Sequence, residues 1–231
     1  MANYKYLLWD IDGTVLNFLA AEKEAIKNLF DRFGLGECTD EMVSRYSAIN
    51  RKHWLALERG ELTKPQVLVG RFVEFFQNEG IPVDIAEEFN RKYQEALGDT
   101  IVFCDNSQEL LLKLKGKYIL AAITNGAKVA QNKKLSVSGL ADIFDYIFIS
   151  EDVGMEKPNK GFFDFVFEKM EIQDKKQVLV IGDSITSDIR GGNNAGVDTC
   201  WYNPECEKKD VEVDITYEIN TLQELEEKAI I

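Results

Sequence analysis

Four short apolar runs, each ending in an acid or a hydroxyl residue, constrain the fold of this chain most. They are "KYLLWD" (5–10), "YILAAIT" (118–124), "YIFIS" (146–150) and "VLVIGD" (178–183). Uninterrupted apolar runs are typical of strands that are covered on both faces, as in a parallel sheet. We expect further strands in "TCWY" (199–202) and "DITYEI" (214–219).

The segments between these runs have the pattern of helices. One helix is indicated by apolar residues at the i, i+3, i+4, i+7 spacing of a helix face, namely Phe163, Val166, Phe167 and Met170. Another, over residues 110–114, is expected to stop at Gly116. Strands that alternate with helices predict an α/β fold with a doubly wound, Rossmann-like parallel sheet.

Residues 17–98 interrupt this alternation. We find no strand-like run between Phe18 and Asp99. One amphipathic stripe ends before Gly34 and consists of Ile26, Leu29, Phe30 and Phe33. A second ends before Gly80 and consists of Leu68, Phe72, Phe75 and Phe76. We therefore predict an α/β core domain formed by residues 1–16 and 99–231, with an all-helical cap domain inserted at 17–98. Asn17-Phe18 and Gly98-Asp99 are the candidate hinges between the two.

Composition narrows the class of partner. The 231 residues are 45% hydrophobic, and 40 acids against 27 Lys and Arg give a net charge of −13. Such a charge repels nucleic acid polymers, so we expect none as a partner. The four cysteines form no metal-binding pattern with the single histidine, and scattered thiols suit a reducing compartment. Without a signal-peptide pattern or an apolar run of about 18 residues, we expect a cytoplasmic protein without a membrane partner, either monomer or homodimer.

The acids at the strand ends are the first candidate site residues. Asp10 and Asp12 are two positions apart, so their side chains leave the strand on the same side. Asp183 ends another apolar run, and parallel strands bring their carboxyl ends to one edge of the sheet. An ordinary Asp-Gly turn is the alternative. Converging carboxylates repel one another unless a cation joins them, and oxygen ligands suit Mg²⁺, with Mn²⁺ or another divalent ion left open.

Two further motifs lie at the same predicted edge. Thr124-Asn125-Gly126 ends the second run with a hydroxyl, an amide and a glycine, a combination that suits an anion-binding turn. Lys157, before Pro158, lies on the loop that follows the third run. Taken alone, the first is compatible with an ordinary loop and the second with a surface charge. Together with the acids, they predict a site for a phosphoryl group.

With these motifs in order, the sequence resembles the haloacid dehalogenase superfamily of phosphotransferases. The motifs are Asp10-Ile-Asp12-Gly-Thr14-Val, Thr124-Asn125-Gly126, Lys157-Pro158, and Gly182-Asp183 with Asp188. The resemblance implies that Asp10 attacks phosphorus and forms an aspartyl-phosphate. It also implies that Asp12 protonates the leaving oxygen and then activates water.

The same resemblance implies the roles of the remaining motif residues. Mg²⁺ is held by the Asp10 carboxylate, the Asp12 backbone carbonyl and Asp183. Thr124 and Asn125 bind phosphate oxygens, and Lys157 neutralises charge on Asp10 and the phosphate. Asp188 fixes Lys157 or a metal-bound water.

Within the superfamily, "INRKHWLALERGEL" (49–62) and the stretch from 151 to 204 are similar to bacterial pyrimidine 5′-nucleotidases. This similarity implies a small phosphate ester as partner, namely a nucleoside monophosphate. Asn50, His53 and Trp54 are the candidate specificity residues, since an aromatic ring can stack on a base and an amide can bind its edge. The alternative for Trp54 is a core residue, and the alternative for His53 is a surface histidine or one whose hydrogen bonds are satisfied within the protein.

The predicted function is thus Mg²⁺-dependent hydrolysis of a nucleoside 5′-monophosphate. The alternatives are a phosphatase or mutase for another small ester, such as phosphoglycolate or a sugar phosphate, and a binding protein that has lost its chemistry.

Overall fold

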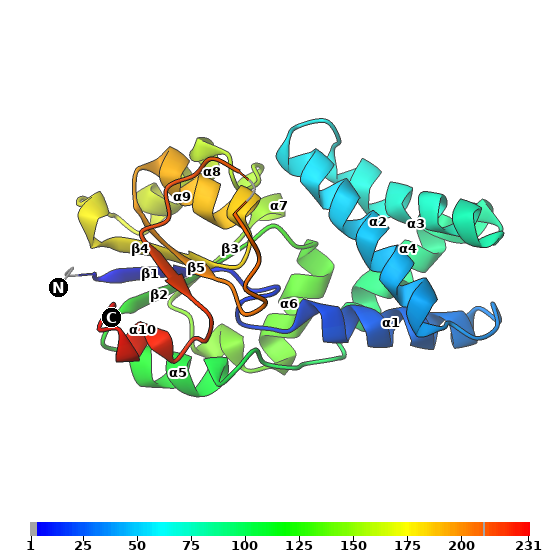
Figure 1. Cartoon of the computed structure of the whole chain (residues 1–231), viewed down its shortest axis with the longest axis horizontal. Coiled ribbons are helices and arrows are strands. Elements are labelled where there is room, and N and C mark those ends of the chain that lie inside the picture. Colours follow the sequence, from blue (N-terminus) through cyan, green and yellow to red (C-terminus); the bar gives the residue numbers. More distant parts are fainter. Residues whose placement is uncertain (1–3, 210) are drawn as a thin grey trace.

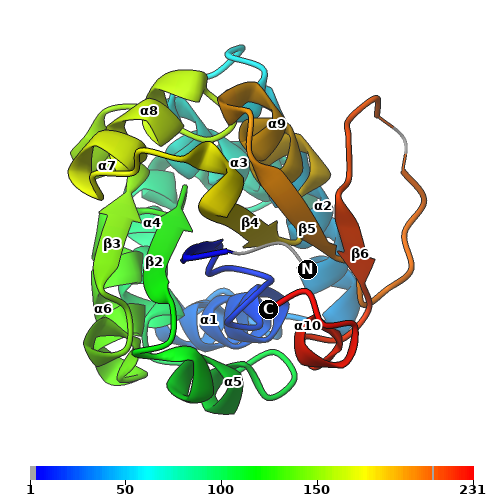
Figure 2. The same cartoon turned by 90° about the vertical axis from the view of Figure 1, so that its left-hand side faces the viewer.

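Six parallel strands form one sheet in the computed structural model, which describes residues 4–209 and 211–231. They are β1 (Tyr6–Trp9), β2 (Ile119–Thr124), β3 (Tyr146–Ile149), β4 (Val178–Gly182), β5 (Asp198–Tyr202) and β6 (Tyr217–Ile219). Their order is β3-β2-β1-β4-β5-β6 (Figure 2). The winding reverses beside β1, where open α/β sheets bind ligands. The predicted doubly wound sheet is confirmed; residues 1–3 and 210, assigned to its domain, lie outside the described residues.

Both faces of the sheet are covered, which explains the uninterrupted apolar runs. In β1, Leu7 and Trp9 pack in the cluster that includes α5 (Ser107–Leu114), α6 (Lys128–Val137) and α10 (Glu224–Glu227). Tyr6 and Leu8 point to the other face, toward α8 (Lys160–Lys169) and α9 (Arg190–Ala195). Figure 1 shows these two helical layers on either side of the strands. Successive residues of a strand therefore enter different halves of the core.

Three helices end at or near the glycines that were predicted to stop them. Gly34, Gly80 and Gly116 take positive φ angles of 64°, 70° and 79° directly after or within a few residues of α1 (Phe18–Arg32), α3 (Lys64–Glu79) and α5, as the sequence predicted. The remaining short elements are α7 (Ser150–Val153), single 3₁₀ turns at Val83–Ile85, Leu140–Asp142 and Lys175–Gln177, and a π-helical turn at Ile185–Ile189. The π turn follows β4, the strand that ends beside Asp183, and such turns are frequent at functional sites.

The insertion between β1 and α5 is helical, as predicted. It contains α1 (Phe18–Arg32), α2 (Asp40–Glu58), α3 (Lys64–Glu79) and α4 (Ala86–Leu97). These helices share a separate core rich in fully or almost fully buried aromatic residues: Phe30, Tyr46, Phe72, Phe75, Phe76, Phe89 and Tyr93. Burying each such side chain stabilises the helical layer by about 2 kcal/mol, so the insertion has its own hydrophobic driving force. The boundaries at residues 17 and 98 stay a prediction.

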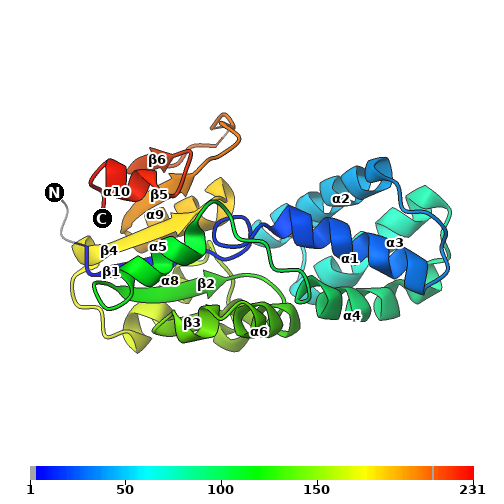
Figure 3. The same ribbon diagram turned by 90° about the horizontal axis from the view of Figure 1, so that it is seen from below.

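The helical insertion lies beyond the carboxyl ends of the strands (Figures 1 and 3). Asn17 caps α1 by accepting a hydrogen bond from the Ala20 N–H at 3.0 Å, and its own N–H donates to the Val102 carbonyl at 2.7 Å. The two connecting segments are thus tied together where they leave the sheet. Among the described residues, no helix combines the length and apolar character needed to cross a membrane.

Candidate active site

A cavity of about 180 Å³ lies between the strand ends and the helical insertion. Core residues at one side of it include the predicted motif residues Asp10, Asp12, Thr124, Asn125, Lys157, Asp183 and Asp188. Residues of the insertion complete the wall: Phe18, Trp54, Glu58, Arg71, Gln94 and Leu97. The four motifs therefore do meet in one place, although up to 178 positions separate them in the sequence.

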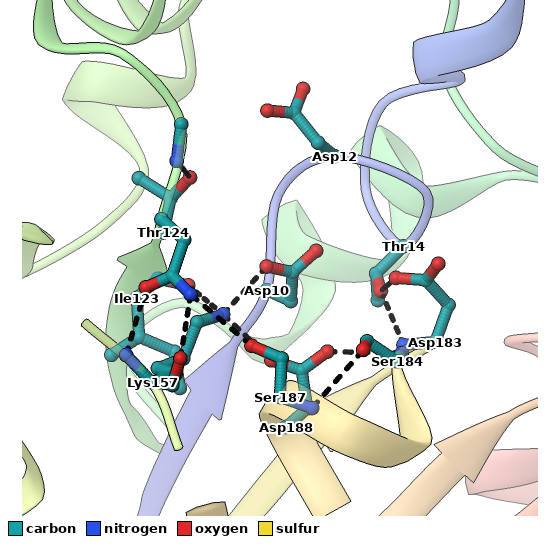
Figure 4. Close-up of polar contacts among 12 residues, drawn as sticks. Asp10, Asp12, Thr14, Ile123, Thr124, Lys157, Asp183, Ser184, Ser187 and Asp188 are labelled. Carbon is teal, nitrogen blue, oxygen red and sulfur yellow. Dashed lines mark hydrogen bonds and ion pairs between the residues drawn. The ribbon is translucent and has the colours of Figure 1, made fainter. Parts of the chain in front are cut away.

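Lys157 is the centre of the buried charges (Figure 4). Its side chain is 1% exposed, and its Nζ donates to Asp10 Oδ1 at 2.7 Å, to Asp188 Oδ1 at 2.6 Å and to the Ile123 carbonyl at 2.8 Å. All three ammonium protons thus have an acceptor. Burial alone would lower the pKa of Lys157, but the Asp10 and Asp188 carboxylates outweigh it and hold the pKa above its ordinary value.

The donor set fits a hard divalent cation. Oxygens of Asp10, Asp183 and Asp188 lie within 4.8 Å of one another, and Asp10 Oδ2 is buried without a hydrogen-bond partner among the described residues. Burial, opposed by Lys157, raises the pKa of Asp10 well above its ordinary value. Burial and then Asp188 raise the pKa of Asp183 to about 7. Added positive charge would keep these carboxylates ionised, as Mg²⁺ does with oxygen ligands.

Asp183 and Asp188 differ in their remaining contacts. Both Asp188 oxygens accept hydrogen bonds, from Lys157 and from the Ser184 N–H at 3.1 Å. Asp183 Oδ1 accepts from the Thr14 hydroxyl at 3.0 Å, and that hydroxyl oxygen in turn accepts from the Asp183 N–H. Asp188 thus orients Lys157, while Asp10 and Asp183 each keep a carboxylate oxygen that accepts no hydrogen bond within the described residues.

Gly13 allows the first motif to approach Asp183. Its φ is +103°, and a Cβ built there would lie 2.4 Å from Asp183 Oδ2. A side chain is therefore excluded by both the backbone conformation and the space. The Gly-Thr pair after Asp12 brings the loop of β1 against the end of β4.

The Asp12 carboxylate points away from Asp10 (Figure 4). It accepts hydrogen bonds from Gln131 Nε2 at 2.6 Å and from Lys134 Nζ, both on α6. Lys134 Nζ also lies 5.3 Å from the ring centroid of Phe18, the first residue of α1. The two acids of the first motif therefore have different cationic partners, so they are not equivalent.

Thr124 and Asn125 of the second motif also have different contacts. Thr124 Oγ1 accepts from the Gly126 N–H at 3.0 Å and keeps its hydroxyl proton for another acceptor. Asn125 instead binds the backbone of Lys157: its Nδ2 donates to the carbonyl at 2.8 Å and its Oδ1 accepts from the N–H at 2.9 Å. The Asn125 amide thus orders the lysine loop in this structure, and its predicted contact with phosphate stays a prediction.

Of the three candidate specificity residues in the insertion, the structure brings only Trp54 to the cavity wall. Asn50 is 4% exposed and lies behind the wall, between Glu22 and Arg71. His53 bonds Glu74 through Nε2 at 2.9 Å and packs against Gly70, outside the cavity lining. Direct substrate contact by Asn50 or His53 therefore has no geometric support.

Sequence reasoning missed several wall residues, among them Glu58, Arg71, Gln94, Gln131 and Lys134. For α6 a signal existed. Ala127, Ala130, Gln131 and Lys134 follow the i, i+3, i+4, i+7 spacing and are all buried. A lysine within such a stripe indicates a helix face that is covered by a polar site. Arg71 carries a similar signal, because the buried Lys64, Val67 and Arg71 of α3 follow the i, i+3, i+7 spacing. Gln94 precedes the buried Leu97 of α4 by three positions.

Chain-long similarity to known proteins agrees with this geometry. Residues 7–202 match the haloacid dehalogenase-like hydrolase family. HAD-hydrolase YfnB of Bacillus subtilis is 39% identical over 225 residues, which cover 97% of this chain and 95% of YfnB. The crystal structure of YfnB bound to magnesium has a TM-score of 0.93 at 38% identity, covering 99% of this chain and 100% of that one.

Two other relatives have a named substrate class. Pyrimidine 5′-nucleotidase PynA of Streptococcus pneumoniae is 34% identical over 223 residues (96% of this chain, 93% of PynA). Pyrimidine 5′-nucleotidase YjjG of Escherichia coli is 30% identical over 224 residues (97% of each chain). The family match includes all four motifs and the helical insertion, so the predicted resemblance is confirmed: this chain belongs to the haloacid dehalogenase-like hydrolase family.

Proposed function

We propose that this protein is a Mg²⁺-dependent phosphatase that hydrolyses pyrimidine nucleoside 5′-monophosphates through an aspartyl-phosphate intermediate. One observation carries the proposal. Asp10 has one oxygen fixed by Lys157 and a second, buried oxygen without a partner among the described residues, and it lines a cavity. An oriented carboxylate with one available oxygen is what nucleophilic attack on phosphorus needs.

In the first step, an Asp10 oxygen attacks phosphorus, and the bond from phosphorus to the ester oxygen breaks. Asp12, which must be protonated when the substrate binds, donates that proton to the departing oxygen, which leaves as the nucleoside hydroxyl. In the second step, a water attacks the aspartyl-phosphate and gives its proton to Asp12, which releases inorganic phosphate and restores Asp10. The Asp12 carboxylate suits this exchange because it lines the cavity on the side facing away from Asp10.

The negative charge of a phosphate beside three acids must be offset. When bound at Asp10 and Asp183, Mg²⁺ supplies positive charge that stabilises the transition state. Lys157 holds its ammonium group against Asp10, and the free hydroxyl proton of Thr124 is available to a phosphate oxygen. The helical insertion covers the cavity and limits the access of bulk water.

The preference for pyrimidine nucleotides is supported by the names of PynA and YjjG, which resemble this chain over its length. It is also supported by the aromatic residues Phe18 and Trp54 in the wall formed by the insertion. Planar rings of this kind pack well against a base.

The test is a panel of phosphate esters assayed with Mg²⁺ and with chelator: UMP, dTMP, CMP, phosphoglycolate, glucose 6-phosphate and phenyl phosphate. We expect pyrimidine nucleotides to have the highest kcat/KM and chelator to abolish turnover. Asp10→Asn should remove activity without changing the circular dichroism spectrum. Faster turnover of the sugar phosphate or of phosphoglycolate than of every nucleotide would contradict the substrate assignment.

A further inference from the structure

Behind the cavity wall, five polar side chains from all four helices of the insertion form one hydrogen-bonded chain. In order they are Glu22 on α1, Asn50 on α2, Arg71 on α3, and Asn90 and Gln94 on α4. Four of them are at most 7% exposed, with Asn90 less buried. Polar groups are costly to bury unless they are paired. Arg71 also contacts the aromatic core, because its guanidinium lies 5.1 Å from the ring centroids of Phe72 and Tyr93. Two of the five, Arg71 and Gln94, line the cavity.

The contacts orient each member of this chain. A carboxylate only accepts, so Glu22 Oε2 takes the Asn50 Nδ2 donor at 2.9 Å and turns Asn50 Oδ1 toward Arg71. Arg71 Nη1 donates to that oxygen at 2.6 Å. Asn90 Oδ1 then accepts from Arg71 Nη2 at 3.3 Å and from Gln94 Nε2 at 3.1 Å. The amide of Gln94 is therefore held by its nitrogen.

Two kinds of group remain available to a ligand. Arg71 has five N–H donors, of which Nε donates to the Leu68 carbonyl at 3.3 Å and one on each Nη is used as above. In the described part of the chain, Gln94 Oε1 takes part in no hydrogen bond. Because both side chains bond the same Asn90 oxygen, a donor and an acceptor lie next to each other at the wall.

The Arg71 charge has an acidic group behind it. Burial raises the pKa of Glu22, while the Ser47 hydroxyl, the Arg71 charge and the Asn50 amide oppose that rise. Asn50 bonds both Glu22 and Arg71 and so joins the two groups. Phe18 and Leu97 add apolar surface to the same cavity. A wall of this kind suits a neutral planar ring better than a second anionic group.

We infer that Arg71 and Gln94 bind the edge of a uracil or thymine base, with Gln94 Oε1 accepting from the ring N–H and Arg71 donating to the neighbouring carbonyl. This inference rests on the proposed function and adds the residues that recognise the base. Uracil and thymine carry the required pair at N3–H and the adjacent carbonyl. Trp54 and Phe18 pack against the ring, while Asn50 and Glu22 orient Arg71 from behind.

The test compares UMP with N3-methyl-UMP, which lacks the N–H, and with phenyl phosphate, which has no base edge. In the unmodified protein we expect kcat/KM for UMP to exceed that for N3-methyl-UMP by about tenfold or more. Gln94→Leu should bring this ratio close to one, and a circular dichroism spectrum that matches the unmodified protein reports that the variant is folded. Gln77→Leu, an exposed glutamine on α3, is the matched control and should keep the ratio.

Arg71→Lys keeps the charge but loses the planar fork, so it should lower kcat/KM for UMP by a larger factor than kcat/KM for phenyl phosphate. The surface variant Arg45→Lys is its control. An unchanged UMP to N3-methyl-UMP ratio in Gln94→Leu, beside a tenfold preference in the unmodified protein, overturns the inference alone. A protein that hydrolyses phenyl phosphate but prefers no nucleotide overturns the proposed function and the inference with it. A third outcome also overturns the inference: phosphoglycolate is turned over faster than UMP, and this turnover is lost in Arg71→Lys. Arg71 would then bind an anionic group of the substrate and not a base.

Discussion

Replacing Lys157 with Met tests the electrostatic account of the site most directly. Methionine retains the length and the apolar stem but removes the ammonium group that donates to Asp10, Asp188 and the Ile123 carbonyl. Two carboxylates with little exposure then lose their cation. Removing one partner of a buried pair typically costs about 3–5 kcal/mol, and we expect the free energy of unfolding to fall by this amount at pH 7.5 without Mg²⁺.

The loss should depend on pH in a defined direction. Burial already raises the pKa of Asp10 above its value in the unfolded chain, and removal of Lys157 raises it further. A carboxyl group with a raised folded pKa favours the folded state at low pH, and that contribution is lost as the pH rises through the folded pKa. The deficit of Lys157→Met should therefore be small at pH 5 and largest near pH 8. Added Mg²⁺ should reduce the deficit at pH 8.

Urea unfolding followed by tryptophan fluorescence and circular dichroism measures this difference at each pH. Lys160→Met is the matched control, because Lys160 pairs with Asp164 on the exposed side of α8 and its removal should barely change the unfolding midpoint. A loss below about 1 kcal/mol at pH 7.5, or a deficit that is equal at pH 5 and pH 8, would refute the account of Lys157 as the counter-charge of buried carboxylates.

Three other predictions concern the acids and the loop that holds them. Burial raises the pKa of Asp183 to about 7, above its unfolded value, so the Mg²⁺-free protein should lose stability as the pH rises through 7. Below pH 7, protonation of Asp183 should compete with the metal, so the half-saturating Mg²⁺ concentration should rise by up to about tenfold for each pH unit that the pH falls. A half-saturating concentration that does not change with pH would contradict this. Asp12→Asn should slow breakdown of the phospho-enzyme, trapped by rapid quench, more than it weakens Mg²⁺ binding; equal effects would count against its proton-transfer role. Gly13→Ala should lose activity and about 1–3 kcal/mol of stability in thermal or urea unfolding, because the added Cβ meets Asp183. Gly34→Ala is the control and should stay active, because its added Cβ meets no atom within 4 Å.

The sheet was predictable because its signal is local. Each strand run carries its own apolar pattern, and β1, β2, β3 and β4 were found within one or two residues of their bounds. The same locality explains why the glycine stops of the helices were correct. The motif residues at the strand ends could be placed together because parallel strands share one carboxyl edge, a rule that needs no knowledge of side-chain packing.

The wall formed by the insertion was not predictable in this way. Asn50 and His53 were chosen for their chemistry and their neighbourhood in the sequence, yet one lies behind the wall and the other outside it. Arg71 and Gln94, which reach the cavity, lie on helices whose rotation is set by the aromatic core they surround. The periodic pattern of each helix separates its buried face from the face toward solvent, but it does not tell which part of the buried face lines the cavity.

The sequence by itself determined the parallel sheet, the helical insertion and the convergence of Asp10, Asp12, Thr124, Lys157 and Asp183 on one edge. Only the tertiary structure decided how these groups divide their contacts: Lys157 with Asp10 and Asp188, Lys134 with Asp12, and Asn125 with the lysine loop. The physical reason is that hydrogen-bond partners depend on distances of a few ångströms between segments far apart in the chain. Strand pattern sets which edge a residue reaches, whereas packing between elements sets which neighbour it meets there.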